Sequence, residues 1–108
     1  MNVDVKWDKV TPSRWATGHI DAEAARLQRH LPESSHLHMR VARQGPRYQT
    51  KVHVHALGRD WIAAADGENL WEGISAAFSK ILRKLDEFKS VHKNKIHRRM
   101  KEQINYLY

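Results

Sequence analysis

The chain of 108 residues contains no cysteine, only five glycines and three prolines, and no long apolar run. Without cysteine it has no disulfide and no zinc or iron–sulfur centre held by thiolates. No apolar stretch approaches the ~20 residues that span a bilayer, and the amino terminus lacks the apolar core of a signal peptide. These absences predict a cytoplasmic protein of one domain that makes no contact with a membrane.

Positive charge is abundant and unevenly distributed. The formal net charge is +7. From Lys80 to the carboxy terminus there are nine Lys and Arg residues against three Asp and Glu, so this segment carries nearly all of the excess. A strongly basic chain most often binds a polyanion, and nucleic acid is the first candidate.

Four segments are predicted to be strands. Apolar and polar residues alternate with a period of two, which is typical of strands that bury one face. The segments span residues 2–8, 35–43, 48–57 and 61–65. Turn residues, Gly45-Pro46 and Gly58-Arg59-Asp60, separate the last three segments. We therefore expect these three strands to form an antiparallel meander.

Two further segments have apolar residues three or four positions apart, which indicates helices with one buried stripe. The first is predicted to begin with Thr11 as its cap and Pro12 at its first position, and to end at Pro32. The second begins near Asn69, and its apolar stripe comprises Leu70, Ile74, Ala77, Phe78, Ile81, Leu85 and Phe88. The order β-α-β-β-β-α predicts an α+β fold, a two-layer sandwich in which both helices lie on one face of a four-stranded sheet.

The second helix is longer than the sheet requires. About 16 residues of helix match a strand of about seven residues, so the helix needs to reach only about Phe88. We divide the chain into a single α+β domain over residues 1–90 and a basic C-terminal helix extension or tail over residues 91–108. A frayed, solvated tail is an equally good interpretation of the second part.

Lys and Arg residues of this helix and its extension are the main candidates for RNA contact, because cations displace the counterions condensed on phosphates. A lysine-rich helix surface is often only a solvated face, but here the charge is one-sided. The candidates are Lys80, Arg83, Lys84, Lys89, Lys93, Lys95, Arg98 and Arg99. A second basic group around the turn after the second strand comprises Arg40, Arg43, Arg47 and Lys51.

Histidines alternate on two predicted neighbouring strands and are expected to point outward. They are His36, His38, His53 and His55. Imidazoles bind zinc, but no carboxylate partner lies in these strands and the chain has no HExxH motif. We interpret them as solvent-exposed strand positions and expect neither a metal nor a cofactor. Protonation of these side chains below about pH 6.5 would strengthen binding to RNA.

The tryptophans are predicted to lie in the core, and the sequence has no recognisable catalytic motif. The four tryptophans, Trp7, Trp15, Trp61 and Trp71, each fall on a predicted inward stripe and are expected in the core. Paired carboxylates, a Ser-His-Asp order and a glycine-rich phosphate loop are all missing from the sequence. We therefore expect no enzymatic activity and no small-molecule substrate.

The segment from Lys51 to Arg99 resembles the family of ribosome hibernation-promoting factors and ribosome-associated translation inhibitors. The resemblance is carried by KVHVHALGRDWIAAADGENLWEGISAAFSKILRKLDEFK. Family members have a strand of the type hydrophobic-His-Val, followed by a strand of small residues that ends in an acidic residue and glycine. An Asp-hydrophobic-Tyr opening and a basic amphipathic helix follow. Here Asn69 and Trp71 stand in place of the usual Asp and Tyr.

The resemblance implies a protein that binds the small ribosomal subunit and its ribosomal RNA in the channel used by tRNA and mRNA, and thereby inhibits translation by idle ribosomes under stress. It is similar to the short members, which lack a dimerisation domain, so we expect a monomer when free. One alternative is a stand-alone module of the double-stranded-RNA-binding type, which shares the β-β-β-α ending. Another is a partner-binding protein that uses an apolar row of the tail, Ile96, Met100, Ile104 and Leu107, as an oligomer seam.

Overall fold

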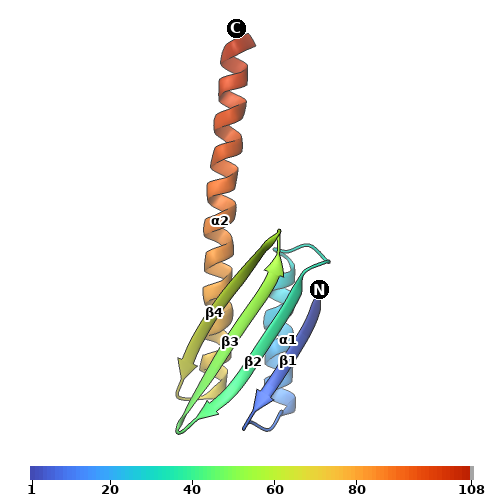
Figure 1. The fold of residues 1–108 in the computed structure, drawn as a ribbon, viewed down its shortest axis with the longest axis vertical. Coiled ribbons are helices and arrows are strands. Elements are labelled where there is room, and N and C mark those ends of the chain that lie inside the picture. The colour runs from blue at the N-terminus through green and yellow to red at the C-terminus, as the bar shows by residue number, and fades with distance from the viewer. Residues whose placement is uncertain (108) are drawn as a thin grey trace.

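The computed structural model describes the backbone of residues 1–107 and the side chains of residues 1–90. Four strands and two helices follow one another along the chain (Figure 1). They are β1 (Asn2–Asp8), α1 (Arg14–Gln28), β2 (His36–Gln44), β3 (Arg47–Ala56), β4 (Arg59–Gly67) and α2 (Leu70–Leu107). The predicted β-α-β-β-β-α order is confirmed.

The sheet has the strand order β1-β2-β3-β4. β1 runs parallel to β2 and is joined to it by a crossover through α1, whereas β2, β3 and β4 pair antiparallel. Apolar residues share one row across the sheet, since Met39 lies opposite both Val5 and Val52, and Val52 lies opposite Ala63. The meander and the crossover are therefore as the sequence predicts.

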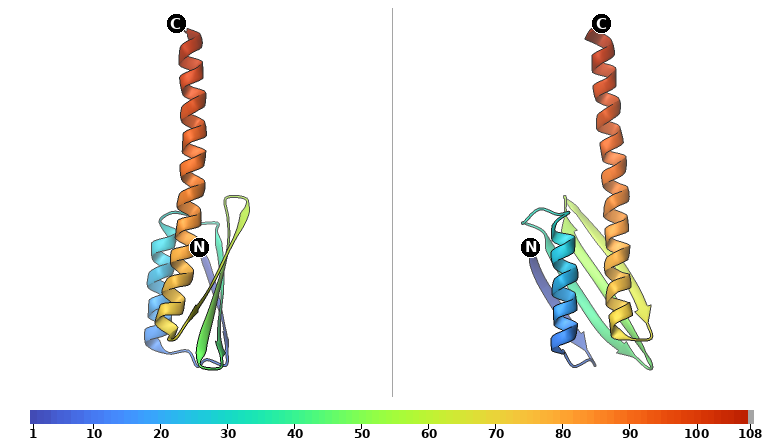
Figure 2. Two further views of the ribbon diagram at one scale, coloured as in Figure 1. Left: turned by 90° about the vertical axis from the view of Figure 1, so that its left-hand side faces the viewer. Right: turned by 180° about the vertical axis from the view of Figure 1, so that it is seen from behind.

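Both helices cover the same face of the sheet, and the other face is uncovered (Figure 2). The core between the layers is made by the inward residues of β2, β3 and β4 and by the apolar stripes of the helices. Leu37, Val52, Ile74, Phe78 and Leu85 are all fully buried there. β1 is covered less completely, and Val3, which the alternation placed inward, is 41% exposed.

The start of α1 differs from the prediction. The helix begins at Arg14, and the side chain of Ser13 caps it by accepting a hydrogen bond of 3.3 Å from the amide of Ala16. Thr11 and Pro12 lie before the cap. The helix also ends at Gln28, before Pro32. A hydroxyl that reaches the orphan amides fixes the start of a helix, and here that hydroxyl belongs to Ser13 and not to Thr11.

Close contact between the start of α2 and the sheet depends on glycine. A β-carbon on Gly73 would lie 3.1 Å from the hydroxyl of the fully buried Thr50, and one on Gly67 would lie 2.8 Å from the carbonyl oxygen of Asn69. Asn69 also caps α2, as predicted, because its Oδ1 accepts a hydrogen bond of 2.9 Å from the amide of Glu72. The first turn of α2 therefore packs directly on β3 and β4.

The second helix continues past the end of the sheet (Figure 1). Its residues up to Phe88 supply the buried stripe, which agrees with the length expected from the strands. The division into a domain over residues 1–90 and an extension over 91–108 stays a prediction.

Candidate nucleic-acid interface

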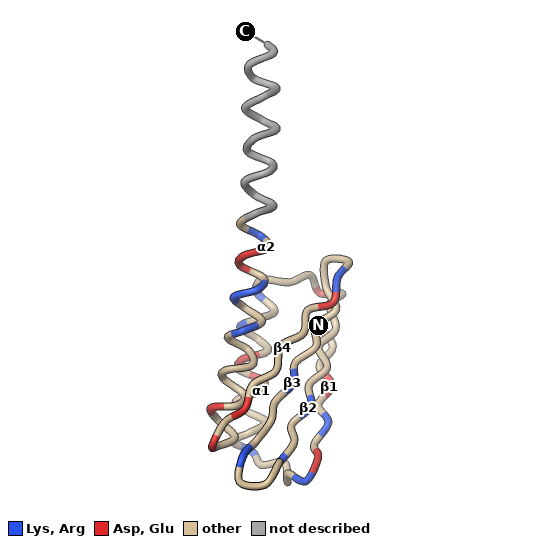
Figure 3. Tube along the Cα trace, turned by 60° about the vertical axis from the view of Figure 1, so that its left-hand side comes forward, with Lys and Arg blue, Asp and Glu red and all other residues tan. Residues whose placement is uncertain are grey.

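A groove runs between β4 and α2 and is bordered by cations. It has a volume of about 400 Å³. Its lining comprises Ile62, Ala63, Ala64, Lys80, Arg83, Lys84 and Glu87. Lys80, Arg83 and Lys84 are exposed, and Figure 3 shows basic positions gathered on the turns of α2 that lie alongside β4. Three of the predicted RNA-contact residues thus lie together at one concave surface.

Two of these lysines also bind the sheet. The ammonium of Lys80 donates a hydrogen bond of 2.7 Å to the carbonyl oxygen of Ala64, and that of Lys84 donates one of 2.5 Å to the carbonyl oxygen of Ile62. β4 is the outer strand, so alternate carbonyl groups along it face away from β3. An ammonium has three N–H donors, so each lysine keeps two for another acceptor.

The remaining candidates of α2 fall into two classes. Lys89 is exposed and donates a hydrogen bond of 2.5 Å to the carbonyl oxygen of His30, which ties α2 to the segment after α1. The other four, Lys93, Lys95, Arg98 and Arg99, lie outside the residues whose side chains are described. Arg83, for which no described contact is found, is the candidate most available for a phosphate.

The second basic group is divided by the structure. Arg40 and Lys51 lie opposite each other on the uncovered face of the sheet. Arg43 and Arg47 instead flank the hairpin between β2 and β3. Arg43 donates from Nε to the carbonyl oxygen of Gly45 at 3.2 Å and lies over the ring of Tyr48. These four cations therefore do not form one patch.

A carboxylate partner for Arg40 comes from β1. Its Nη2 donates a hydrogen bond of 2.8 Å to Oδ2 of Asp8. This hydrogen bond is the main reason that the pKa of Asp8 lies below its ordinary value of 3.8. Arg40 is thus already paired within the sheet, which leaves Lys51 as the cation on this face better placed for a ligand.

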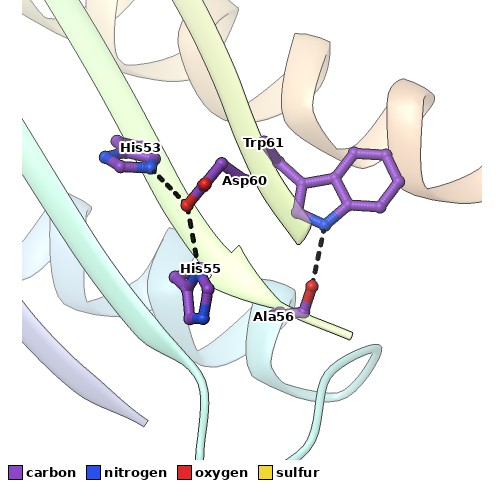
Figure 4. A network of polar contacts seen from close by, with 5 residues as sticks. All are labelled: His53, His55, Ala56, Asp60 and Trp61. Carbon is purple, nitrogen blue, oxygen red and sulfur yellow. Dashed lines mark hydrogen bonds and ion pairs between the residues drawn. The ribbon is translucent and has the colours of Figure 1, made fainter. Parts of the chain in front are cut away.

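The outward histidines also meet carboxylates, which the prediction missed. Oδ1 of Asp60 lies 2.9 Å from Nε2 of His53 and 2.9 Å from Nδ1 of His55 (Figure 4). A carboxylate oxygen only accepts, so each of these ring nitrogens carries the hydrogen. The two bonds, that from His55 first, lower the pKa of Asp60 below 3.8. Asp60 was predicted to lie in a turn, but it belongs to β4, which brings it beside β3.

Among the described residues no group of three or more His, Cys, Asp or Glu side chains is placed to hold an ion. In the same part of the chain, no helix has the length and apolar character needed to cross a membrane.

The tryptophans do not all lie in the core. Trp61 is buried, as expected, and donates from Nε1 to the carbonyl oxygen of Ala56 at 3.2 Å (Figure 4). Its ring also meets that of Phe88 edge-on. Trp7 is half-buried. Trp15 and Trp71 are each 51% exposed, so for these two the prediction was wrong. Both occupy the first turn of a helix, where the neighbouring Ala16 and Leu70 take the inward positions.

Two solved structures share this architecture. One is a ribosomal subunit interface protein from Coxiella burnetii, with a TM-score of 0.74 and 13% sequence identity over 83% of this chain and 99% of that chain. The other is the N-terminal domain of Protein Y from Thermus thermophilus, with a TM-score of 0.73 and 15% identity over 82% and 99% of the two chains. The chain has the fold of these two proteins. The resemblance inferred from the sequence is therefore confirmed at the level of the fold. No family model matches the sequence, and no curated protein sequence matches it either.

Proposed function

We propose that this protein binds the small ribosomal subunit through ribosomal RNA and inhibits translation by occupying the channel of tRNA and mRNA. It acts by its bulk and catalyses no reaction. The observation that carries the proposal is the groove between β4 and α2 with its three exposed cations. Support comes from the shared fold with a ribosomal subunit interface protein and from the net charge of +7.

The chemistry of the groove suits a phosphate backbone. Arg83 offers a planar fork of donors that grips a phosphate through two hydrogen bonds. Lys80 and Lys84 are held at fixed positions by β4, so less side-chain entropy is lost when they bind. Five or six phosphate contacts predict a log–log salt slope of about −4, at ~0.7 per contact on single-stranded RNA.

The decisive experiment reverses the charge of Arg83 alone. Reversal of Lys80 and Lys84 would also remove hydrogen bonds to β4, so a loss of binding there would be ambiguous. We expect Arg83→Glu to reduce co-sedimentation with ribosomes in sucrose gradients and to make the salt slope shallower by about 0.7 to 1.4. Arg26→Glu makes the same charge change on the exposed side of α1 and is the matched control. Its affinity for ribosomes should be closer to that of the unchanged protein than the affinity of Arg83→Glu is.

Two outcomes would overturn the proposal. One is Arg83→Glu and Arg26→Glu binding ribosomes as tightly as the unchanged protein at every salt concentration. The other is binding to a plain RNA duplex as tight as binding to ribosomes, which would favour a double-stranded-RNA-binding module.

The segment from residue 91 onward is proposed to add to this surface. It contains five Lys and Arg residues and one Glu. A chain that ends after Ser90 should retain the fold, because residues 1–90 contain the four strands, α1 and the buried stripe of α2. It should bind ribosomes more weakly and with a smaller salt slope. Retained affinity in that shortened chain would confine the interface to residues 1–90.

A further inference from the structure

Two exposed tryptophans stack on each other at the end of the molecule where both helices begin. The ring centroids of Trp15 and Trp71 are 6.0 Å apart and their planes are 27° apart. Half of each side chain remains open to solvent, since each is 51% exposed. Large aromatic side chains left exposed next to each other are unusual on a monomer surface and often mark a binding site.

A stacked histidine holds the ring of Trp71 in its orientation. His19 stacks against its ring with centroids 3.6 Å apart and planes 8° apart. The imidazole is buried, and its Nε2 forms a hydrogen bond of 2.9 Å with the hydroxyl of Ser75. A ring held by a buried partner on the neighbouring helix loses little freedom when a ligand stacks on it.

The two rings border a hollow of about 870 Å³. That volume lies within the range of small-molecule sites. The lining comprises Lys9, Val10, Thr11, Ser13, Trp15, Arg43, Tyr48, Glu68, Asn69, Leu70, Trp71 and Glu72. Three connecting segments meet there: the β1–α1 segment, the β2–β3 hairpin and the β4–α2 turn.

Charge in the hollow is balanced, with Lys9 and Arg43 against Glu68 and Glu72. A purely cationic site would suit a bare phosphate, whereas this one suits an uncharged ring that has both donors and acceptors at its edge. The carboxylates can accept from the amino groups of a base. The terminal nitrogens of Arg43, for which no hydrogen bond is described, can donate to an adjoining phosphate.

The backbone of Lys9 is strained. Its φ is +56°, a left-handed conformation that is unfavourable for a residue with a β-carbon. Strain of this kind concentrates at binding sites, where it holds a side chain in place. The strained residue is one of the two cations of the hollow.

We propose that this hollow binds an unpaired nucleobase of single-stranded RNA, stacked on Trp15 and Trp71. The inference rests on the proposed function, because it names the chemistry of a second contact with the same partner. Stacking on an aromatic ring accepts every base and requires that the base be out of a duplex. A proline-rich peptide also packs on paired tryptophans, but it would leave the charged residues of the hollow without partners.

The test uses the full chain and a fluorophore-labelled oligo(A) of eight nucleotides, with binding measured by anisotropy at low and at raised salt. We expect Trp15→Ala to weaken binding by at least ~5-fold, the lower range for one lost base–aromatic stack. Trp15→Phe keeps a ring and should stay within about twofold to threefold of the parent. Val3→Ala removes a similarly exposed apolar side chain from β1 and is the control, with unchanged affinity expected.

The salt dependence separates stacking from charge. The ratio of affinities between the parent and Trp15→Ala should be the same at both salt concentrations, whereas the effect of Arg83→Glu should shrink as salt rises. A blunt RNA duplex of the same length should bind Trp15→Ala and the parent equally. If Trp15→Ala misfolds by circular dichroism, Trp15→Leu, which keeps an apolar side chain but has no ring, replaces it and should show the same loss of affinity.

Three results would overturn the inference. They are oligo(A) binding that is indifferent to Trp15→Ala, an equal loss on the duplex, and displacement of oligo(A) by a proline-rich decapeptide that binds more tightly. Ribosome co-sedimentation distinguishes the two proposals. Binding to ribosomes with no dependence of oligo(A) affinity on Trp15 removes only the stacking site. Dependence on Trp15 without any binding to ribosomes removes only the proposed function.

Discussion

The ammonium of Lys80 lies 2.7 Å from the carbonyl oxygen of Ala64, so a cation of the helix closes an open hydrogen-bonding position on the outer strand. Lys84 repeats the contact two residues earlier along β4, at Ile62. Unpaired edges of sheets are templates for association with other chains, and lysines protect such edges. The same two lysines thus occupy hydrogen-bonding positions of the sheet edge and leave positive charge exposed at the surface.

This double role predicts the behaviour of Lys80→Gln combined with Lys84→Gln. The variant should lose about 1–3 kcal/mol of unfolding free energy, because it removes two hydrogen bonds that contribute ~0.5–1.5 kcal/mol each. It should self-associate at high concentration, since the β4 edge loses its charges. Urea unfolding and light scattering measure the two effects. A variant that stays monomeric would show that the twist and the groove of β4 protect the edge without the lysines.

The contacts of Gly67 and Gly18 predict opposite effects of the same substitution. In Gly67→Ala the new β-carbon would lie 2.8 Å from two backbone atoms of the α2 start, so α2 must shift. We expect a loss of about 1–3 kcal/mol, typical of overpacking. In Gly18→Ala nothing lies within 4 Å of the new carbon, and the helix should gain about 0.5–1 kcal/mol. The urea midpoints of the two variants measure both effects. Midpoints that shift equally from that of the unchanged protein would contradict the packing described at β4.

The fold was predictable because apolar residues recur along every strand and helix with the period of that element. All of these apolar faces can be buried together in only one arrangement of layers. The meander, the crossover and the single covered face all follow from that. The site was predictable only in part. Lys80, Arg83 and Lys84 share a helical face by spacing, which a sequence shows directly. The contact of Lys80 with β4 depends on which strand lies at the edge, and spacing alone does not determine that.

The wrong predictions for Trp15 and Asp60 also arise because tertiary structure decides between positions that the sequence pattern allows. Helical spacing allowed either Trp15 or Ala16 to face inward, and the smaller residue took the buried position. Asp60 was assigned to a turn because Gly58 begins one. The two-residue loop Leu57-Gly58 is shorter than that turn, so Asp60 pairs opposite His55 in the sheet. The register determines which residues lie opposite each other on neighbouring strands, and it depends on the tertiary structure.

Leu57 itself occupies an unfavourable conformation, which leads to a stabilising substitution. Ala56 and Arg59 are paired in register, and the two residues between them have φ values of +57° and +68°. Hairpin turns with two positive φ values prefer Asn or Gly at the first position. We expect Leu57→Asn to raise the free energy of unfolding by about 1 kcal/mol, since the left-handed penalty is reduced. Leu57→Ala keeps that penalty and should show no such gain. A lower thermal midpoint for Leu57→Asn would mean that the exposed leucine side chain packs more favourably than its 41% exposure indicates.

Asp60 links stability to pH through its two histidine partners. Its pKa is lowered in the folded protein, chiefly by the hydrogen bond from His55 and next by that from His53. The stabilising contribution is therefore fully present above the ordinary value of 3.8 and is lost as the pH falls below it, through the folded pKa. We expect Asp60→Asn to have a lower urea midpoint than the parent at pH 7 and the difference to narrow when the pH is lowered to about 3. In a background of His53→Ala and His55→Ala, which removes both donors, Asp60→Asn should have little effect at either pH. A difference that is the same at both pH values in the unchanged background would show that the carboxylate acts through its place in β4 and not through its bonds to the imidazoles.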